Sequence, residues 1–319
     1  DNNVGGYNSV LKVGEEVEKA PEIFTDRVSG DTVFLSSQNP VEEWLIYIQN
    51  QLLSQRSIIQ SGSVTGIVIP EEARKLKRSE LRVWAINKYG VSNDVFIPLD
   101  KGKVIEKASL LNRFDKRAST LYFLMVDRFN DAQGENNHPL DPKEVLPLAN
   151  YMGGDIVGIT QKLKEGYFDS LGMNTIWLSP ITQNPEGAYG FWKDPKTKFS
   201  GYHGYWPVSS SKVDYRYGTS EELKELVEEA HKRNINVILD YVANHVHEEH
   251  PLYKQHQEWA TDLYLPDGSL NTERWDEHRL TTWFDTFLPT LNLENPEVYG
   301  PMTDSALFWI KEYNLDGFR

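Results

Sequence analysis

The sequence predicts two structural parts: a small β-sandwich over residues 21–105, and an α/β region over residues 119–319 that forms the first half of a (β/α)8 barrel. Short runs of β-branched and aromatic residues, separated by turn signals, predict the sandwich. Buried apolar strands that alternate with amphipathic helices predict a parallel sheet with right-handed crossovers. A length of 319 residues fits two domains, or one large domain with an appendage.

The N-terminal part begins with a polar segment, residues 1–20, for which we expect a flexible arm. The predicted sandwich strands, all rich in β-branched or aromatic residues, lie at 32–35, 44–48, 67–69, 81–86 and 95–99. Gly30-Asp31, Asn39-Pro40 and Tyr89-Gly90 mark turns between them. The pattern is typical of an immunoglobulin or fibronectin module. The charged stretch 106–118 is typical of a linker.

The α/β region repeats a buried strand followed by a helix. The predicted strands are 121–126, 175–178, 235–241 and 315–319, and the predicted helices are 159–171, 219–234 and 303–313. Thr219 and Glu222 form a capping box at the start of the second helix. Residues 246–300, rich in His, Trp, Pro and Asn, interrupt the rhythm, and we expect an irregular inserted subdomain there.

Two architectures fit a parallel sheet of this kind, an open doubly wound sheet and a closed barrel. An open sheet usually carries a glycine-rich nucleotide loop after its first strand. Here the first strand continues into Asp127-Arg128-Phe129-Asn130-Asp131 instead. A barrel places its active residues at the carboxyl ends of the strands, where polar residues gather in this sequence. We therefore favour the barrel.

Composition excludes several classes of partner. The net charge is −14, from 47 acidic and 33 basic residues, whereas nucleic acids and anionic membranes require a basic face. No stretch approaches the roughly 18–20 apolar residues that span a bilayer. The absence of Cys excludes disulfides, thiolate nucleophiles and Cys–zinc sites.

The loop after the first strand is rich in oxygen ligands. Six positions could supply side-chain or backbone oxygens: Asp131, Gln133, Asn136, Asn137, Gly153 and Asp155. Ca²⁺ takes roughly 6–8 such oxygens. Spacing alone favours an ordinary solvated loop over a metal site.

Polar residues also follow the third strand. Asp240 ends it, and Asn244 and His245 come next at the same rim. A buried, unpaired carboxylate is costly, so Asp240 needs a partner. Arg319, at the end of the neighbouring strand, predicts a charge-assisted ion pair with Asp240. The alternative is that this pair only fastens two strand ends.

Two further clusters have competing interpretations. Residues 202–206 place Tyr202, His203, Tyr205 and Trp206 around Gly204, as a sugar platform or as ordinary aromatic core. His245, His247 and His250 could form a metal site like that of binuclear metal amidohydrolases. That metal hypothesis is the weaker one, because the histidines follow the third strand rather than the first.

Taken in order, these motifs resemble the α-amylase family, glycoside hydrolase family 13. The matching segments are 126–131, 172–180, 202–206, 240–245, 288–292 and 316–319. The resemblance implies that Tyr205 stacks on the sugar at the cleavage site within the platform motif that includes Trp206. It also implies that His203 and His245 bind sugar hydroxyls, that Asp240 and Arg319 orient the nucleophile, and that Asn244 lies behind them.

The resemblance further implies a calcium site of the cyclodextrin-glucanotransferase type at the six oxygen-rich positions. Gln133 departs from the Asn that is usual in that site. Thr290 stands where members with a calcium ion near the active site often carry Asp, so that second ion is expected to be absent.

The implied activity is hydrolysis of α-1,4-glucans such as starch, by a retaining mechanism that needs two carboxylates roughly 5–5.5 Å apart. In the family, the nucleophile lies two positions beyond the arginine that matches Arg319, and the general acid comes from the fifth strand. We therefore expect residues 1–319 to be inactive alone and to need the C-terminal half of the barrel as partner. We also expect a secreted, periplasmic or cell-surface protein.

Two alternatives of related origin stay open. One is a glucanotransferase, although Thr286 is smaller than the aromatic residue often found in cyclodextrin-forming members. The other is a catalytically inert relative that binds carbohydrate or acts as a scaffold.

Overall fold

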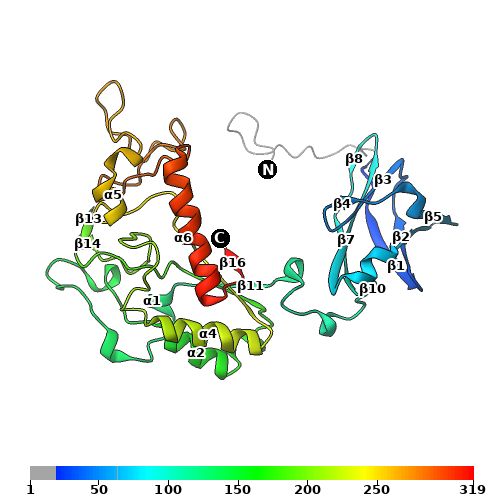
Figure 1. Ribbon diagram of the computed structural model, residues 1–319, viewed down its shortest axis with the longest axis horizontal. Coiled ribbons are helices and arrows are strands. Elements are labelled where there is room, and N and C mark those ends of the chain that lie inside the picture. Colours follow the sequence, from blue (N-terminus) through cyan, green and yellow to red (C-terminus); the bar gives the residue numbers. More distant parts are fainter. Residues whose placement is uncertain (1–18, 63) are drawn as a thin grey trace. The chain divides into compact units, whose positions relative to one another are not determined.

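The computed structural model describes residues 19–62 and 64–319 (Figure 1). The expected arm at 1–20 therefore lies outside the described residues, except for its last two positions. The chain divides into two compact units between Asp115 and Lys116, and this division falls within the predicted linker.

The N-terminal unit is a sandwich of two antiparallel sheets, as predicted. One sheet has the order β1 (Ile23–Ser29), β2 (Thr32–Ser37), β6 (Val64–Val68), β5 (Ile58–Ser61). The other has the order β10 (Lys103–Val104), β9 (Val95–Asp100), β7 (Arg78–Asn87), β3 (Glu43–Ile48), β4 (Gln51–Leu52), with β8 (Gly90–Val91) paired to β7. Every second residue of β7 is buried, because successive side chains of a strand point to opposite faces.

The core of this unit lies between the two sheets. Leu35, Ile46, Ile67, Leu81 and Leu99 are all at most 1% exposed and come from both sheets. Three short 3-10 helices, η2 (Gln55–Ser57), η3 (Glu71–Lys75) and η4 (Ala108–Leu110), connect or follow the strands.

The second unit is built on a four-stranded parallel sheet. Its order is β11 (Leu121–Leu124), β12 (Thr175–Leu178), β15 (Asn236–Leu239), β16 (Gly317–Phe318), so spatial order follows chain order as in a (β/α)8 barrel. The paired residues Leu124, Leu178 and Leu239 are level with one another, and Leu239 is level with Phe318. The residues that follow these strands therefore meet at one edge.

Helices separate the strands. They are α1 (Val126–Phe129), α2 (Ile156–Lys164), α3 (Tyr167–Ser170), α4 (Ser220–Lys232), α5 (Pro251–Gln255) and α6 (Pro296–Tyr313), with short 3-10 turns η5 (Lys116–Ala118), η6 (Gly134–Asn136), η7 (Pro147–Ala149) and η8 (Gln257–Trp259). The predicted capping box of α4 is present, and its predicted apolar stripe is buried. Helix α2 packs against α4 (Figure 1), and a shared core joins both to the sheet.

Two predicted helices have different bounds. The predicted helix 159–171 is interrupted at Gly166, whose φ of 77° lies in the left-handed region that ends helices, and the chain resumes as α3. Helix α6 begins at Pro296 rather than at 303, because Asn295 caps it and proline suits the first helical position.

The inserted segment 246–300 is largely irregular. Isolated β-bridges, such as Ala260 with Leu291 and Thr272 with Trp283, connect its extended segments. A small hydrophobic core supports the segment and consists of Val246, Leu291, Val298 and Met302. A hairpin that the sequence analysis missed, β13 (Tyr189–Lys193) and β14 (Lys196–Phe199), precedes the 202–206 motif. Of the helices in the described residues, none combines the length and hydropathy that crossing a bilayer requires.

Candidate active site

The sheet places Asp240 and Arg319 at the same edge. The backbone N–H of Asp240 donates to Leu178 O (2.9 Å), and that of Arg319 donates to Leu239 O (3.0 Å). These bonds continue the parallel ladders past the ends of β15 and β16. Both side chains therefore start level with each other, as the sequence predicted.

The expected ion pair between them is nevertheless wrong for this structure. In the described residues, Asp240 and Arg319 make no contact within 4.0 Å that counts as an ion pair. Instead, the Tyr205 hydroxyl donates to Asp240 Oδ2 (2.8 Å), and the Arg319 guanidinium lies over the Trp177 ring, 5.1 Å from its centroid. A phenol satisfies the buried carboxylate without a second buried charge, while the arginine keeps a cation–π contact.

Two histidines hold the backbone of Tyr205. His203 Nδ1 accepts from the Tyr205 N–H, and His245 Nε2 bonds the Tyr205 carbonyl, both at 2.9 Å. A carbonyl only accepts, so His245 carries its proton on Nε2. Burial lowers the pKa of each imidazole to about 4, so both are neutral at physiological pH. Burial and the bond to Asp240 raise the pKa of Tyr205 to about 12, so its hydroxyl stays protonated as a donor.

Gly204 makes this loop feasible. Its φ is +84°, and a Cβ added there would lie 2.0 Å from Pro180 O. Only glycine allows the loop to approach the end of β12 this closely.

Trp206 does not serve as an open platform, contrary to the sequence-based expectation. It is 8% exposed and packs edge-on against Phe287, with ring centroids 5.2 Å apart. The half-buried Tyr205 and His203 rings stack at 5.8 Å and 28°. These two rings, rather than Trp206, can present a face to a ligand.

A buried network of hydrogen-bonded polar side chains, which was not predicted from the sequence, supports the 202–206 loop. Asn184, fully buried, accepts from the Trp206 N–H (3.0 Å). The Asn184 N–H donates to Asp214 Oδ2 (2.9 Å), and Arg216 Nη1 contacts both oxygens of Asp214 (3.1 Å). Burial raises the pKa of Asp214, and the Arg216 charge opposes that shift. The available signal was the polar run Thr182-Gln183-Asn184, a few residues after an apolar strand.

Each of the three histidines of the alternative metal hypothesis uses at least one ring nitrogen in another hydrogen bond. His247 Nδ1 accepts from the Glu249 N–H (3.1 Å), and His250 caps α5 while contacting Ser210 Oγ (3.0 Å). Within the described residues, no group of three or more His, Cys, Asp or Glu is arranged to hold a metal ion.

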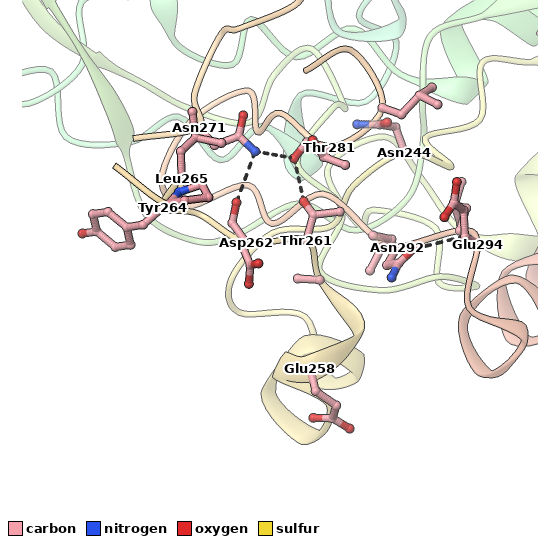
Figure 2. A pocket seen from close by; sticks show the side chains of 15 residues that line it. Asn244, Glu258, Thr261, Asp262, Tyr264, Leu265, Asn271, Thr281, Asn292 and Glu294 are labelled. Atoms are coloured by element: carbon pink, nitrogen blue, oxygen red, sulfur yellow. Dashed lines mark hydrogen bonds between the residues drawn. The ribbon is translucent and has the colours of Figure 1, made fainter. Parts of the chain in front are cut away.

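Asn244 and residues of the inserted segment line a pocket of about 770 Å³ (Figure 2). Its Nδ2 is 3.5 Å from Thr290 Oγ1, whose proton goes to Thr282 O (2.8 Å). On the wall shown in Figure 2, Asn271 and Thr261 both donate to the Thr281 carbonyl, at 3.1 and 2.6 Å. This pocket is polar and braced by backbone contacts.

The oxygen-rich loop is assembled around Asp155, which caps α2. Its Oδ1 accepts from the Gly158 N–H (2.6 Å), and its Oδ2 accepts from the N–H groups of Ala132 and Gln133 (3.1 and 2.8 Å). Asn137 Nδ2 donates to Asp131 Oδ2 (2.7 Å). The structure thus brings the two ends of the predicted calcium site together.

Most of these residues fit a calcium ion. Asn136 Oδ1 and Asn137 Oδ1 are buried without a hydrogen-bond partner in the described residues. This is rare for buried polar atoms, and such oxygens could ligate a cation. Asn137 Oδ1 also lies so close to Gly153 that a Cβ there would be 2.1 Å away. The Gln133 side chain is directed toward α4, where its Nε2 donates to Glu222 Oε1 (2.8 Å).

The second unit is thus a half-barrel whose strand ends carry a tyrosine–histidine loop and a buried acid. The family profile described as "Alpha amylase, catalytic domain" matches residues 123–319, and the chain belongs to the α-amylase family.

Relatives and solved structures agree with this. The chain is 30% identical over 225 residues to "Alpha-amylase 2" of Dictyoglomus thermophilum, covering 68% of this chain and 34% of that protein. It is also 30% identical over 246 residues to a cyclomaltodextrin glucanotransferase of Geobacillus stearothermophilus, covering 72% and 34%. The chain thus spans about a third of the length of these curated relatives.

Among structures, the Anoxybacillus α-amylase matches with 36% identity and a TM-score of 0.52, covering 63% of this chain and 40% of that one. The match to a maltogenic amylase from S. marinus includes 93% of this chain and 47% of that chain, with a TM-score of 0.51. At 21% identity, this likeness shows the fold alone.

Proposed function

We propose that this chain forms the sugar-holding part of a retaining glycoside hydrolase that acts on α-1,4-glucans such as starch and maltooligosaccharides. The observation that carries the proposal is Tyr205, held by neutral His203 and His245 and hydrogen-bonded to Asp240 at the edge of the sheet. The names of the relatives, which include α-amylases and a maltogenic amylase of Bacillus subtilis, support this class of substrate.

Each residue has a role in the proposed site. The Tyr205 ring stacks on the sugar at the cleavage site, and His203 and His245 exchange hydrogen bonds with its hydroxyls. Asp240 and Arg319, level on neighbouring strands, orient the nucleophile. We propose that this nucleophile and the general acid lie outside residues 1–319, in the remaining half of the barrel, so that 1–319 alone is inactive.

We further propose a Ca²⁺ ion held by Asp131, Asn136, Asn137, Asp155 and the Gly153 carbonyl, with the Gln133 side chain excluded. When bound, calcium would supply a fixed positive charge that joins the loop to the start of α2. A secreted, periplasmic or cell-surface location suits such a protein, because sites of extracellular modules work at about 10⁻⁴–10⁻³ M calcium.

A glucanotransferase is the second candidate, because a cyclomaltodextrin glucanotransferase matches as well as the α-amylase does. Thr286, exposed and bonded to Asp285 Oδ1 through its N–H (2.6 Å), offers no large ring to an acceptor sugar. This favours hydrolysis.

Product analysis on the full-length protein tests these proposals. Incubation with maltoheptaose should release linear α-maltooligosaccharides, and Tyr205→Ala should reduce the rate. Cyclic or lengthened products would favour the transferase. Binding without turnover would favour an inert relative, and neither binding nor turnover of any glucan would refute the proposed function.

A further inference from the structure

A small cavity is lined by segments that follow β12 and β15 and by helix α6. Its lining includes Thr182 after β12, Tyr241 after β15 and Met302 on α6. The volume open to the centre of a water molecule is about 10 Å³. One water molecule requires roughly 10–15 Å³ of such space. The cavity therefore has room for one water molecule and for nothing larger.

Two hydroxyl groups of this lining are shielded from solvent and, among the described residues, have no hydrogen-bond partner: Thr182 Oγ1 and Tyr241 Oη. Ser305 lies close to the Tyr241 hydroxyl, but its own proton goes to Pro301 O (2.8 Å). Burial raises the pKa of Tyr241 to about 12, so its hydroxyl stays protonated and can donate. Buried polar groups are almost always paired, because an unpaired group loses its bonds to water without replacement.

A third hydroxyl at the cavity also has a proton to donate. His250 Nδ1 accepts from the Leu252 N–H (3.1 Å), so the neutral ring carries its proton on Nε2. Burial lowers the pKa of His250 to about 4, which keeps the ring neutral at physiological pH. His250 Nε2 therefore donates to Ser210 Oγ (3.0 Å), and the Ser210 proton is directed to another acceptor. Cavities that stay dry are lined by apolar atoms, whereas this one is lined by donors and acceptors.

We propose that one ordered water molecule occupies this cavity and bridges Thr182 Oγ1, Tyr241 Oη and Ser210 Oγ. Buried waters typically make about three hydrogen bonds to groups that are otherwise unpaired, and these hydroxyls supply that number. The water joins three segments that are distant in the chain: the loop after β12, the loop before α4 and the residue after Asp240. This inference goes beyond the proposed function and does not depend on it.

The position of Tyr241 gives the water a structural role at the edge of the sheet. The Tyr241 N–H donates to Arg319 O (3.2 Å), and its ring centroid lies 5.2 Å from that of Phe318 on β16. Tyr241 therefore contacts the neighbouring strand through both its backbone and its ring. A water that fixes the Tyr241 hydroxyl stabilises the alignment of β15 with β16.

A crystal structure of the full-length protein, at a resolution that shows ordered water, tests the occupancy. We expect one density peak within about 2.6–3.2 Å of all three hydroxyl oxygens. A cavity without density, or one filled by a side chain, would refute the proposal. A peak with several oxygens at about 2.3–2.6 Å would also refute it, because such distances indicate a cation rather than water.

Melting temperatures of the full-length protein test whether the hydroxyls share one water. Tyr241→Phe and Thr182→Val should each lower the melting temperature by about 2–4 °C, the loss expected from one hydrogen bond in a unit of this size. The double variant should lose less than the sum, because the first substitution already removes a partner of the same water. Tyr299→Phe is the matched control, since Tyr299 lies on α6 and is 52% exposed. Additive losses, or a Tyr241→Phe variant that melts with the control, would contradict the shared water.

Discussion

Replacing Gly204 by alanine should both destabilise the barrel unit and disable the candidate site. Gly204 has a φ of +84°, and the new Cβ would lie 2.0 Å from Pro180 O and 2.8 Å from Pro180 C. Both contacts are with backbone, so no side chain can rotate to relieve them. The loop must therefore move away from the end of β12.

Two contributions set the magnitude. A left-handed conformation costs a residue with a Cβ about 1–2 kcal/mol. Overpacking against well-packed backbone costs about 1–3 kcal/mol more. The sum, about 2–5 kcal/mol, corresponds to a fall of roughly 5–15 °C in the melting temperature of a unit of this size. Because Tyr205 is the next residue, its 2.9 Å bonds to His203 and His245 should be lost with the same movement.

Scanning calorimetry and glucan cleavage by the full-length protein provide the assay. Gly300→Ala is the control: it lies within α6, nothing lies within 4 Å of the added Cβ, and alanine should stabilise the helix by about 0.5–1 kcal/mol. The reasoning is refuted if Gly204→Ala melts at the same temperature as Gly300→Ala and cleaves glucans at the wild-type rate.

Three further predictions concern individual groups. Tyr205→Phe removes the donor to buried Asp240 and should lower stability by about 1–2 kcal/mol and kcat/KM at least tenfold; a wild-type kcat/KM would show that this bond does not matter. Burial raises the pKa of Asp127 from 3.8 to about 6, so its contribution to stability is complete below about pH 4 and is lost as pH rises through 6. The loss is about 3 kcal/mol. Asp127→Asn should therefore make the melting temperature less dependent on pH across that range; an unchanged pH dependence would contradict the assignment. Chelation with EDTA should lower the melting temperature and Ca²⁺ should restore it, in the wild type and in Gln133→Ala but not in Asn137→Ala; restoration in all three would exclude the proposed ligands.

Local patterns in the sequence were sufficient to predict the parallel sheet and helix α4. A continuous apolar run such as 175–178 identifies a strand buried on both faces, and β12 occupies those four residues. Thr219 and Glu222 identified the start of α4 because both partners of a capping box lie within one turn. These signals depend only on neighbours in the chain, which is why they were sufficient.

The inserted segment could not be predicted in the same way. Its residues are held by long-range contacts between side chains and backbone, such as Trp283 Nε1 to Thr261 O (3.1 Å), which leave no periodic pattern. Whether a single aromatic residue is buried also depends on long-range contacts. Trp206 and Trp275 look alike in sequence, yet Phe287 covers the first, whereas the second projects from a fixed segment and is exposed.

The side-chain partner of Asp240 could not be predicted from the sequence, because it depends on tertiary packing. Strand register predicted that Asp240 and Arg319 would be level, and the backbone bonds to Leu178 and Leu239 agree. Register does not determine which donor reaches the carboxylate, because that depends on the 202–206 loop, which Gly204 brings close to the end of β12. The Tyr205 hydroxyl arrives there as a neutral donor, so the carboxylate is satisfied on one oxygen while the arginine charge stays on the Trp177 face. Tyr205 therefore has two roles in the proposed site: its ring would face the sugar, and its hydroxyl donates to one carboxylate oxygen of Asp240.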